Sequence, residues 1–119
     1  LDVLQREQLV ERARDVVIPA FAARWRSLAD HPHVGEARSV GLIGALELVR
    51  DRGSRERFAK ELKAGERCRD LCIEGGLVMR AVGDTMIVAP PLVITEAGLD
   101  ELVAKARRAI DLTVAALGA

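Results

Sequence analysis

Residues 34–49, with the sequence VGEARSVGLIGALELV, form the stretch that decides the fold. Valine, leucine and isoleucine are frequent in it, which favours β-structure. Gly41 and Gly44 interrupt the run and indicate a bulge or a bend, so one bent strand and two successive strands both fit. From Leu42 to Val49 apolar side chains stand at odd and even positions alike, which predicts a strand covered on both faces.

A helix is predicted before this stretch, over residues 2–29, because apolar residues recur there at helical spacing. Pro19 lies inside the helix and has no backbone N–H to donate, so we expect a kink near Val17 and Ile18. The sequence His31-Pro32-His33 then ends the helix in a loop. The predicted apolar stripe and the residues beside it are Val3, Val10, Ala13, Val17, Ala20, Phe21, Arg24 and Leu28.

After the stretch, residues 51–54 form a predicted turn, and Ser54 is the predicted N-cap of a second helix that runs to about Ile73. Gly75 and Gly76 end this helix, because glycine readily adopts the left-handed conformation found at helix C-termini. The side chains predicted to face the core from this segment are Phe58, Leu62, Cys68 and Cys72.

Two short strands, residues 77–81 and 86–89, flank a turn at residues 82–85 and predict a hairpin. Thr95 is predicted to cap a last helix, with Glu96 in its positive first turn. The order of helix, strands, helix, hairpin and helix predicts an α+β fold, a small antiparallel sheet of three or four strands packed against helices. The inward stripe of the last helix is Leu99, Leu102, Val103, Ala106, Ile110, Val114 and Leu117.

The composition excludes several classes of protein. The 119 residues include 18 Lys and Arg against 18 Asp and Glu, so no excess charge favours binding to nucleic acid or to an anionic membrane. No run of about 18 apolar residues exists, which excludes a membrane-spanning helix. Two cysteines and an N-terminus unlike a secretion signal indicate the cytoplasm. Because the sequence lacks an initial Met and begins inside a helical pattern, we expect residues 1–119 to be one domain of a longer protein.

Arg80 is the candidate binding residue, because it lies at the end of a predicted strand just before a glycine-containing turn. A guanidinium stays charged at every working pH and binds a carboxylate through two parallel hydrogen bonds. A solvated arginine at a strand end is the alternative interpretation, and the residue pattern alone leaves both open.

The cysteines and histidines do not form a predicted metal site. Cys68 and Cys72 lie four residues apart on one helix face without further ligands nearby, so we interpret them as core residues. His31 and His33 flank a proline and are interpreted as residues of a solvated turn.

The lysines do not offer a predicted cofactor site either. Lys60, Lys63 and Lys105 lie on predicted helices among charged neighbours, whereas a lysine that forms a Schiff base with a cofactor needs a desolvated pocket. Asp84 is interpreted as a turn former without a catalytic role. We therefore predict no catalytic, cofactor-binding or metal-binding residue in this chain.

Two segments are similar to the class III aminotransferases. Residues 34–49 resemble the family pattern VGEVRGxGLMxGIELV, and residues 76–95, GLVMRAVGDTMIVAPPLVIT, resemble the family's closing hairpin, GLxxRxxGDxxxxxPPLxIT. The helices around both segments fit as well, so the resemblance covers nearly the whole chain. The chain thus resembles the C-terminal small domain of a fold type I enzyme that depends on pyridoxal phosphate.

The resemblance implies a homodimer in which a large domain, absent from this chain, carries the cofactor and the Schiff-base lysine. The whole enzyme would transfer an amino group from an amine or ω-amino acid to a keto acid such as pyruvate, while this domain alone would bind no cofactor and be inactive. In the ω-amino acid–pyruvate branch, the arginine that matches Arg80 grips the substrate carboxylate. The implied partners are the large domain, a second subunit, and small amine and keto-acid substrates.

Two other functions stay open on the sequence. The class III family also includes mutases, racemases and decarboxylases, and the residues that separate these reactions lie mostly in the large domain. A free-standing α+β module that binds a ligand or partner without catalysis also fits, because the chain contains no self-contained catalytic set.

Overall fold

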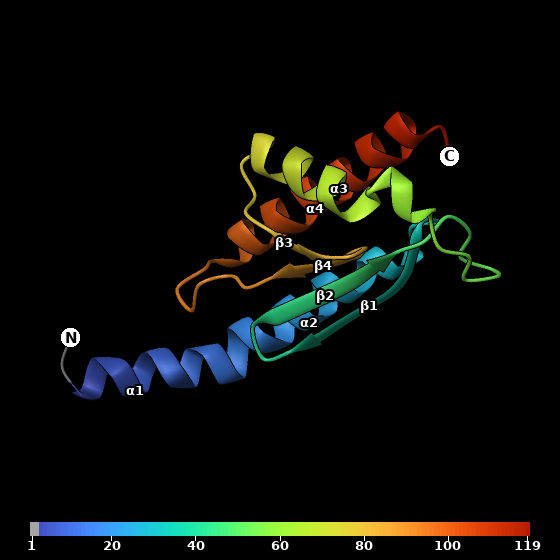
Figure 1. Cartoon of the computed structure of the whole chain (residues 1–119). Coiled ribbons are helices and arrows are strands. Elements are labelled where there is room, and N and C mark those ends of the chain that lie inside the picture. Colours follow the sequence, from blue (N-terminus) through green and yellow to red (C-terminus); the bar gives the residue numbers. More distant parts are fainter. Residues whose placement is uncertain (1–2) are drawn as a thin grey trace.

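The computed structural model describes residues 3–119, and residue 2 of the predicted first helix lies outside this range. The elements follow the predicted order (Figure 1). They are α1 (Val3–Arg12), a π-helical segment (Ala13–Val17), α2 (Ile18–Arg26), a 3-10 helix (Ser27–Asp30), β1 (Val34–Val40), β2 (Ile43–Leu48), a second 3-10 helix (Lys60–Leu62), α3 (Ala64–Glu74), β3 (Arg80–Val82), β4 (Thr85–Val88) and α4 (Glu96–Leu117).

The four strands form one antiparallel sheet in the order β1-β2-β4-β3. Figure 1 shows α3 and α4 side by side and α2 along β1 and β2. Contacts between residues link α3 to α4 and α2 to β1, and Trp25 of α2 donates to the Ala45 carbonyl of β2. Side chains of α2, α3 and α4 share one core with Leu46, Leu48 and Met86 from one face of the sheet. The predicted α+β class and the small antiparallel sheet are confirmed.

The opposite face of the sheet is open. Along β2, Leu46 and Leu48 face the core, whereas Ile43 is 57% exposed and Ala45 and Glu47 are only partly buried. The prediction that both faces of this strand are covered is therefore wrong for the chain that the structure describes. The apolar side chains of β2 that point away from the core line an open surface, where they are available to another molecule or domain.

The helical run before β1 contains the predicted irregularity. The Ile18 N–H donates to the Ala13 carbonyl, an i→i−5 bond that closes the π-helical segment immediately before Pro19. From Ala13 to Leu28 the predicted apolar residues reach the core, but α1 has no buried residue and Val3 is 67% exposed. Figure 1 shows the reason, since α1 extends away from the rest of the molecule. Within residues 3–119, no helix has both the length and the apolar character needed to cross a bilayer.

The second helix starts later than predicted. Ser54 does not cap it: its hydroxyl donates to Asp51 at 3.1 Å and accepts from the Glu56 N–H at 3.3 Å, which closes a local turn. The chain then passes through the second 3-10 helix, and α3 begins only after Lys63, whose φ of 49° is left-handed. The core positions predicted here are confirmed for Phe58, Cys68 and Cys72, whereas Leu62 is partly buried.

Both hairpins turn on two residues, and a glycine with positive φ opens each turn. Gly41, with φ 56°, follows β1, and Gly83, with φ 59°, follows β3. The stretch from residue 34 to residue 49 is thus two strands, one of the two interpretations that fitted the sequence. The second hairpin is shorter than predicted, because β3 begins at Arg80 and the turn comprises only Gly83 and Asp84.

The N-cap of α4 is confirmed and supports a stability prediction. The Thr95 hydroxyl accepts from the Gly98 N–H at 3.0 Å. Replacing Thr95 with alanine removes this acceptor and is expected to lower the free energy of unfolding by about 1 kcal/mol in urea denaturation. Thr95→Ser keeps a capping hydroxyl and serves as the control. Equal stability of the alanine and serine variants would contradict the assigned cap.

Candidate functional site

Arg80 is the first residue of β3, which lies at the edge of the sheet. The prediction placed it at the end of a strand, and the structure places it at the beginning, because the segment before it is not paired. Its Cα partner on β4 is Ile87, which pairs with Ala45, which in turn pairs with Arg38. These four residues form one row across the open face of the sheet, because directly paired side chains point to the same side.

The Arg80 guanidinium is exposed, and within residues 3–119 it has no hydrogen-bond or ion-pair partner. The acidic residues of the same face are engaged elsewhere. Arg38 lies 3.4 Å from a Glu36 carboxylate oxygen, and both Arg38 and Arg57 lie 3.8 Å from Glu47. Arg80 is therefore available to a carboxylate from outside the chain, which a guanidinium binds through two hydrogen bonds.

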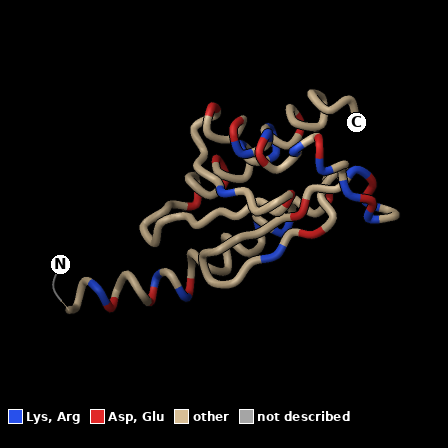
Figure 2. Tube along the Cα trace, viewed as in Figure 1, with Lys and Arg blue, Asp and Glu red and all other residues tan. Residues whose placement is uncertain are grey.

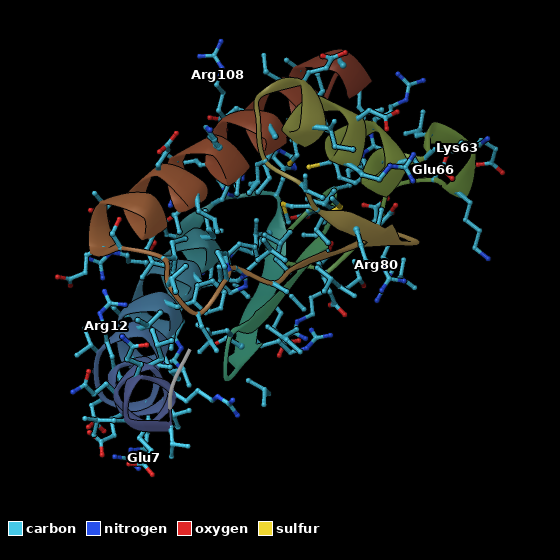
Figure 3. The ribbon with its side chains drawn as sticks, turned by 90° about the vertical axis from the view of Figure 1, so that its left-hand side faces the viewer. Glu7, Arg12, Lys63, Glu66, Arg80 and Arg108 are labelled. Carbon is cyan, nitrogen blue, oxygen red and sulfur yellow. The ribbon has the colours of Figure 1, made fainter. Side chains whose placement is uncertain are left out.

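Apolar side chains surround this cation on the open face. Ile87 and Ala45 are partly buried beside it in the row, and Val82, two residues further along β3, is exposed. Figure 3 shows Arg80 beside the hairpin, well apart from Arg12 on α1 and Arg108 on α4. A cation at the border of an apolar surface suits a small molecule that carries a carboxylate at one end.

Two pockets adjoin this hairpin, and Arg80 is not among the residues that line either of them. One, of about 410 Å³, lies between the hairpin and the start of α3, and its lining includes Arg57, Lys60, Lys63 and Glu66. The other, of about 370 Å³, lies between α4 and the segment that follows β4. Figure 2 shows acidic and basic residues closely mixed in the loop that follows β2.

The lysines of the chain do not fit a covalently held pyridoxal phosphate. Lys60 and Lys63 are exposed, and Lys105, which lines the smaller of these pockets, pairs with Glu101 at 2.9 Å. A lysine that reacts with an aldehyde must lose its proton readily, which needs desolvation or a neighbouring cation. A carboxylate partner has the opposite effect, and exposure keeps the ammonium hydrated.

Cys68 and Cys72 are buried in the core, as predicted, and both are free thiols. The Cys72 sulfur lies 3.5 Å from the sulfur of Met79. A hydrogen bond with Cys68, together with burial, raises the pKa of the Cys72 thiol well above its ordinary value. Within residues 3–119, no three His, Cys, Asp or Glu side chains are grouped so that they could hold a metal ion.

The histidines differ from the prediction of a solvated turn. His31 is only 6% exposed and its Nε2 lies 2.6 Å from an Asp111 carboxylate oxygen. Its Nδ1 accepts from the His33 N–H at 3.1 Å, so Nε2 carries the proton and donates to Asp111. His33 stacks on Phe58 and bonds the Val49 carbonyl at 3.1 Å. The two histidines therefore join the loop before β1 to α4 and to the end of β2. The residues next to them in the sequence give no sign of these contacts.

The known proteins to which the chain is similar and that are named here are all aminotransferases. No protein-family profile matches the chain. The chain is 49% identical, over 97% of its length, to a putrescine–pyruvate aminotransferase of Pseudomonas aeruginosa. It is 36% identical, over 98% of its length, to a diaminobutyrate–2-oxoglutarate transaminase of Halomonas elongata. It spans about a quarter of the length of each of these relatives, 25% in both cases.

A solved structure with the same fold is an ω-aminotransferase from Paracoccus denitrificans, which the chain matches with a TM-score of 0.87 and 35% sequence identity. The match covers 98% of this chain and 26% of that one. The sequence and structure comparisons thus both match this chain to about a quarter of an aminotransferase. The chain matches a C-terminal fragment of the class III, pyridoxal-phosphate-dependent aminotransferases.

Proposed function

We propose that residues 1–119 are the C-terminal small domain of an enzyme that transfers an amino group from an amine or ω-amino acid to a keto acid such as pyruvate. The relatives support this proposal, since those with assigned reactions are aminotransferases and the chain matches nearly its whole length to a quarter of theirs. In this proposal a large domain and a second subunit complete the active sites of a cytoplasmic homodimer. The proposed site depends on one observation: the Arg80 guanidinium is exposed and has no hydrogen-bond or ion-pair partner among the described residues.

Arg80 would bind the substrate carboxylate. The proposed reaction imposes two demands on one pocket, because a keto acid carries a carboxylate and a simple amine does not. A guanidinium left buried and unpaired beside an apolar substrate is costly, so the side chain must leave the pocket when the amine binds. The place of Arg80 on an edge strand supports this role, since no hydrogen bond or ion pair within the described chain holds its guanidinium in one position.

The cofactor is proposed to lie outside this chain. Pyridoxal phosphate, when bound, supplies the electron sink that makes amino-group transfer possible. The exposed or carboxylate-paired lysines described above do not suit its attachment. This chain would instead orient the substrate through Arg80 and be inactive alone.

The rest of the enzyme is proposed to cover surfaces that are exposed here. On α1, Val3, Leu4 and Val10 are exposed, and at the tip of the first hairpin Val40 and Ile43 are exposed as well. Apolar groups of this kind at one end of a domain favour contact with another domain. Their exposure supports a docking surface for the large domain, to which the N-terminal end of α1 would connect.

Amino-group transfer by the complete enzyme tests the proposal. With pyridoxal phosphate, a diamine and pyruvate, we expect alanine to form in an amount equal to the amino groups lost from the diamine, as measured by chromatography of alanine and of the remaining diamine. Reactions without pyruvate or without the cofactor serve as controls and should yield no alanine. Decarboxylation, racemisation or rearrangement of an amino acid without any need for a keto acid would contradict the proposal and favour another class III reaction.

A further inference from the structure

We propose that Asp84 is a positioning residue for the substrate arginine: its carboxylate fastens the β3–β4 turn to the start of α3 and thereby fixes the strand that carries Arg80. This inference rests on the proposed function, because it assigns Asp84 a role only through Arg80. The sequence interpretation of Asp84 as a turn former is correct, but it misses this contact with a helix.

Asp84 connects the turn to two other elements. One carboxylate oxygen accepts from the Gly65 N–H in the first turn of α3 at 3.1 Å. The backbone carbonyl of Asp84 accepts from the Leu48 N–H at the end of β2 at 2.9 Å. The side chain is partly buried. The same residue thus holds the tip of the second hairpin against both a helix and a neighbouring strand.

Asp84 takes the place of a local cap at the start of α3. Lys63, the residue before α3, is left-handed and provides no side-chain hydrogen bond to the helix. Asp84 supplies the missing acceptor from across the fold, and a carboxylate near the positive end of a helix is favourable. Figure 3 shows the start of α3, marked by Lys63 and Glu66, above the hairpin that carries Arg80.

The first turn of α3 lies directly on the hairpin. A Cβ atom added to Gly65 would lie 1.9 Å from the Gly83 carbonyl oxygen and 3.0 Å from the Asp84 Cα. Gly65 itself is buried. Only a glycine allows this approach, so the carboxylate and the helix are placed against each other by the backbone as well as by the hydrogen bond.

β3, the strand that carries Arg80, is short and lies at the edge of the sheet, although Ala81 packs against the core. β3 has three residues and pairs only with β4, so its other edge is unpaired. Short edge strands with one partner open more easily than central strands. Arg80 stands at the open end of β3, four residues before Asp84, and its guanidinium has no partner within residues 3–119. Loosening the turn is therefore expected to displace Arg80.

The test is a double-mutant cycle in the complete enzyme. Asp84→Ala is expected to lower kcat/KM for the keto acid about tenfold, mainly through KM, because the hydrogen bond of a carboxylate is lost. Use of an amine without a carboxylate should stay within about twofold. Asp84→Asn keeps a side-chain oxygen that can accept from Gly65 and should restore most keto-acid use. Asp70→Ala, at an exposed aspartate on α3, is the matched control.

The decisive measurement is Asp84→Ala in the Arg80→Ala background, where no further loss of keto-acid use is expected because the arginine is already gone. A further loss there, or an equal loss for amine and keto acid in Asp84→Ala alone, would overturn the positioning role. If Asp84→Ala does not fold, as judged by circular dichroism, Asp84→Glu replaces it in the cycle with the same criteria. If Arg80→Ala alone fails to discriminate between the substrates, it is the proposed function of Arg80 that is wrong.

Discussion

Replacing Trp25 with alanine is expected to lower the free energy of unfolding by about 3–5 kcal/mol, a large part of the stability of a domain of this size. Trp25 is 0% exposed and is the single tryptophan of the chain. Its ring stacks on Phe21 with centroids 5.8 Å apart, and its Nε1 donates to the Ala45 carbonyl at 3.1 Å. Truncation therefore creates a cavity and removes the hydrogen-bond donor of a strand carbonyl.

Gly44 shows how closely Trp25 packs against β2. A Cβ on Gly44 would lie 2.8 Å from both Phe21 and Trp25, so α2 lies directly on the backbone of β2. Unfolding in urea, followed by circular dichroism because tryptophan fluorescence is lost, measures the effect. Val78→Ala, at a side chain 78% exposed, is the control and should change stability by less than about 0.5 kcal/mol. A loss below about 1 kcal/mol for Trp25→Ala would contradict the assigned packing.

The sequence predicts those parts of the fold that depend on local periodicity and turn chemistry. The last helix, its threonine cap and the second hairpin follow from the spacing of apolar residues and from turn residues such as Gly83, whereas Gly41 and Gly44 leave one bent strand or two strands open for residues 34–49. The start of α3 does not follow, because the Ser54 hydroxyl bonds within its own turn instead of capping a helix. His31 is mispredicted for a related reason, since its partner Asp111 lies 80 residues away.

In the candidate site, too, some features follow from the local sequence and others depend on contacts between distant segments. The residue type and the flanking glycine single out Arg80, and the proposed role of this arginine comes from the family resemblance alone. Its row with Ile87, Ala45 and Arg38 is a property of strand register, which depends on pairings between distant segments. The absence of a partner for its guanidinium among the described residues likewise depends on where the acidic side chains of the sheet lie.

Replacing Arg80 with alanine in the complete enzyme is expected to lower kcat/KM for the keto acid about 100-fold, because a charged, bidentate interaction with the carboxylate is lost. An amine without a carboxylate makes no such interaction, so its kcat/KM should change by less than about twofold. Steady-state kinetics with each substrate varied separately measures the two effects. Arg108→Ala, at an exposed arginine on α4, removes the same side chain far from the open sheet face and should leave both substrates unaffected.

Arg80→Lys separates the charge from the geometry of this group. Lysine keeps the positive charge but replaces the planar fork with a single ammonium, so it should recover only part of the keto-acid activity. Full recovery would mean that a point charge is sufficient and that the bidentate geometry is not used. Equal losses for amine and keto acid in Arg80→Ala would instead mean that the guanidinium supports the fold or the domain contact. In that case the substrate carboxylate is bound by another residue, and Arg38, the other arginine of the row, is already engaged by Glu36 and Glu47.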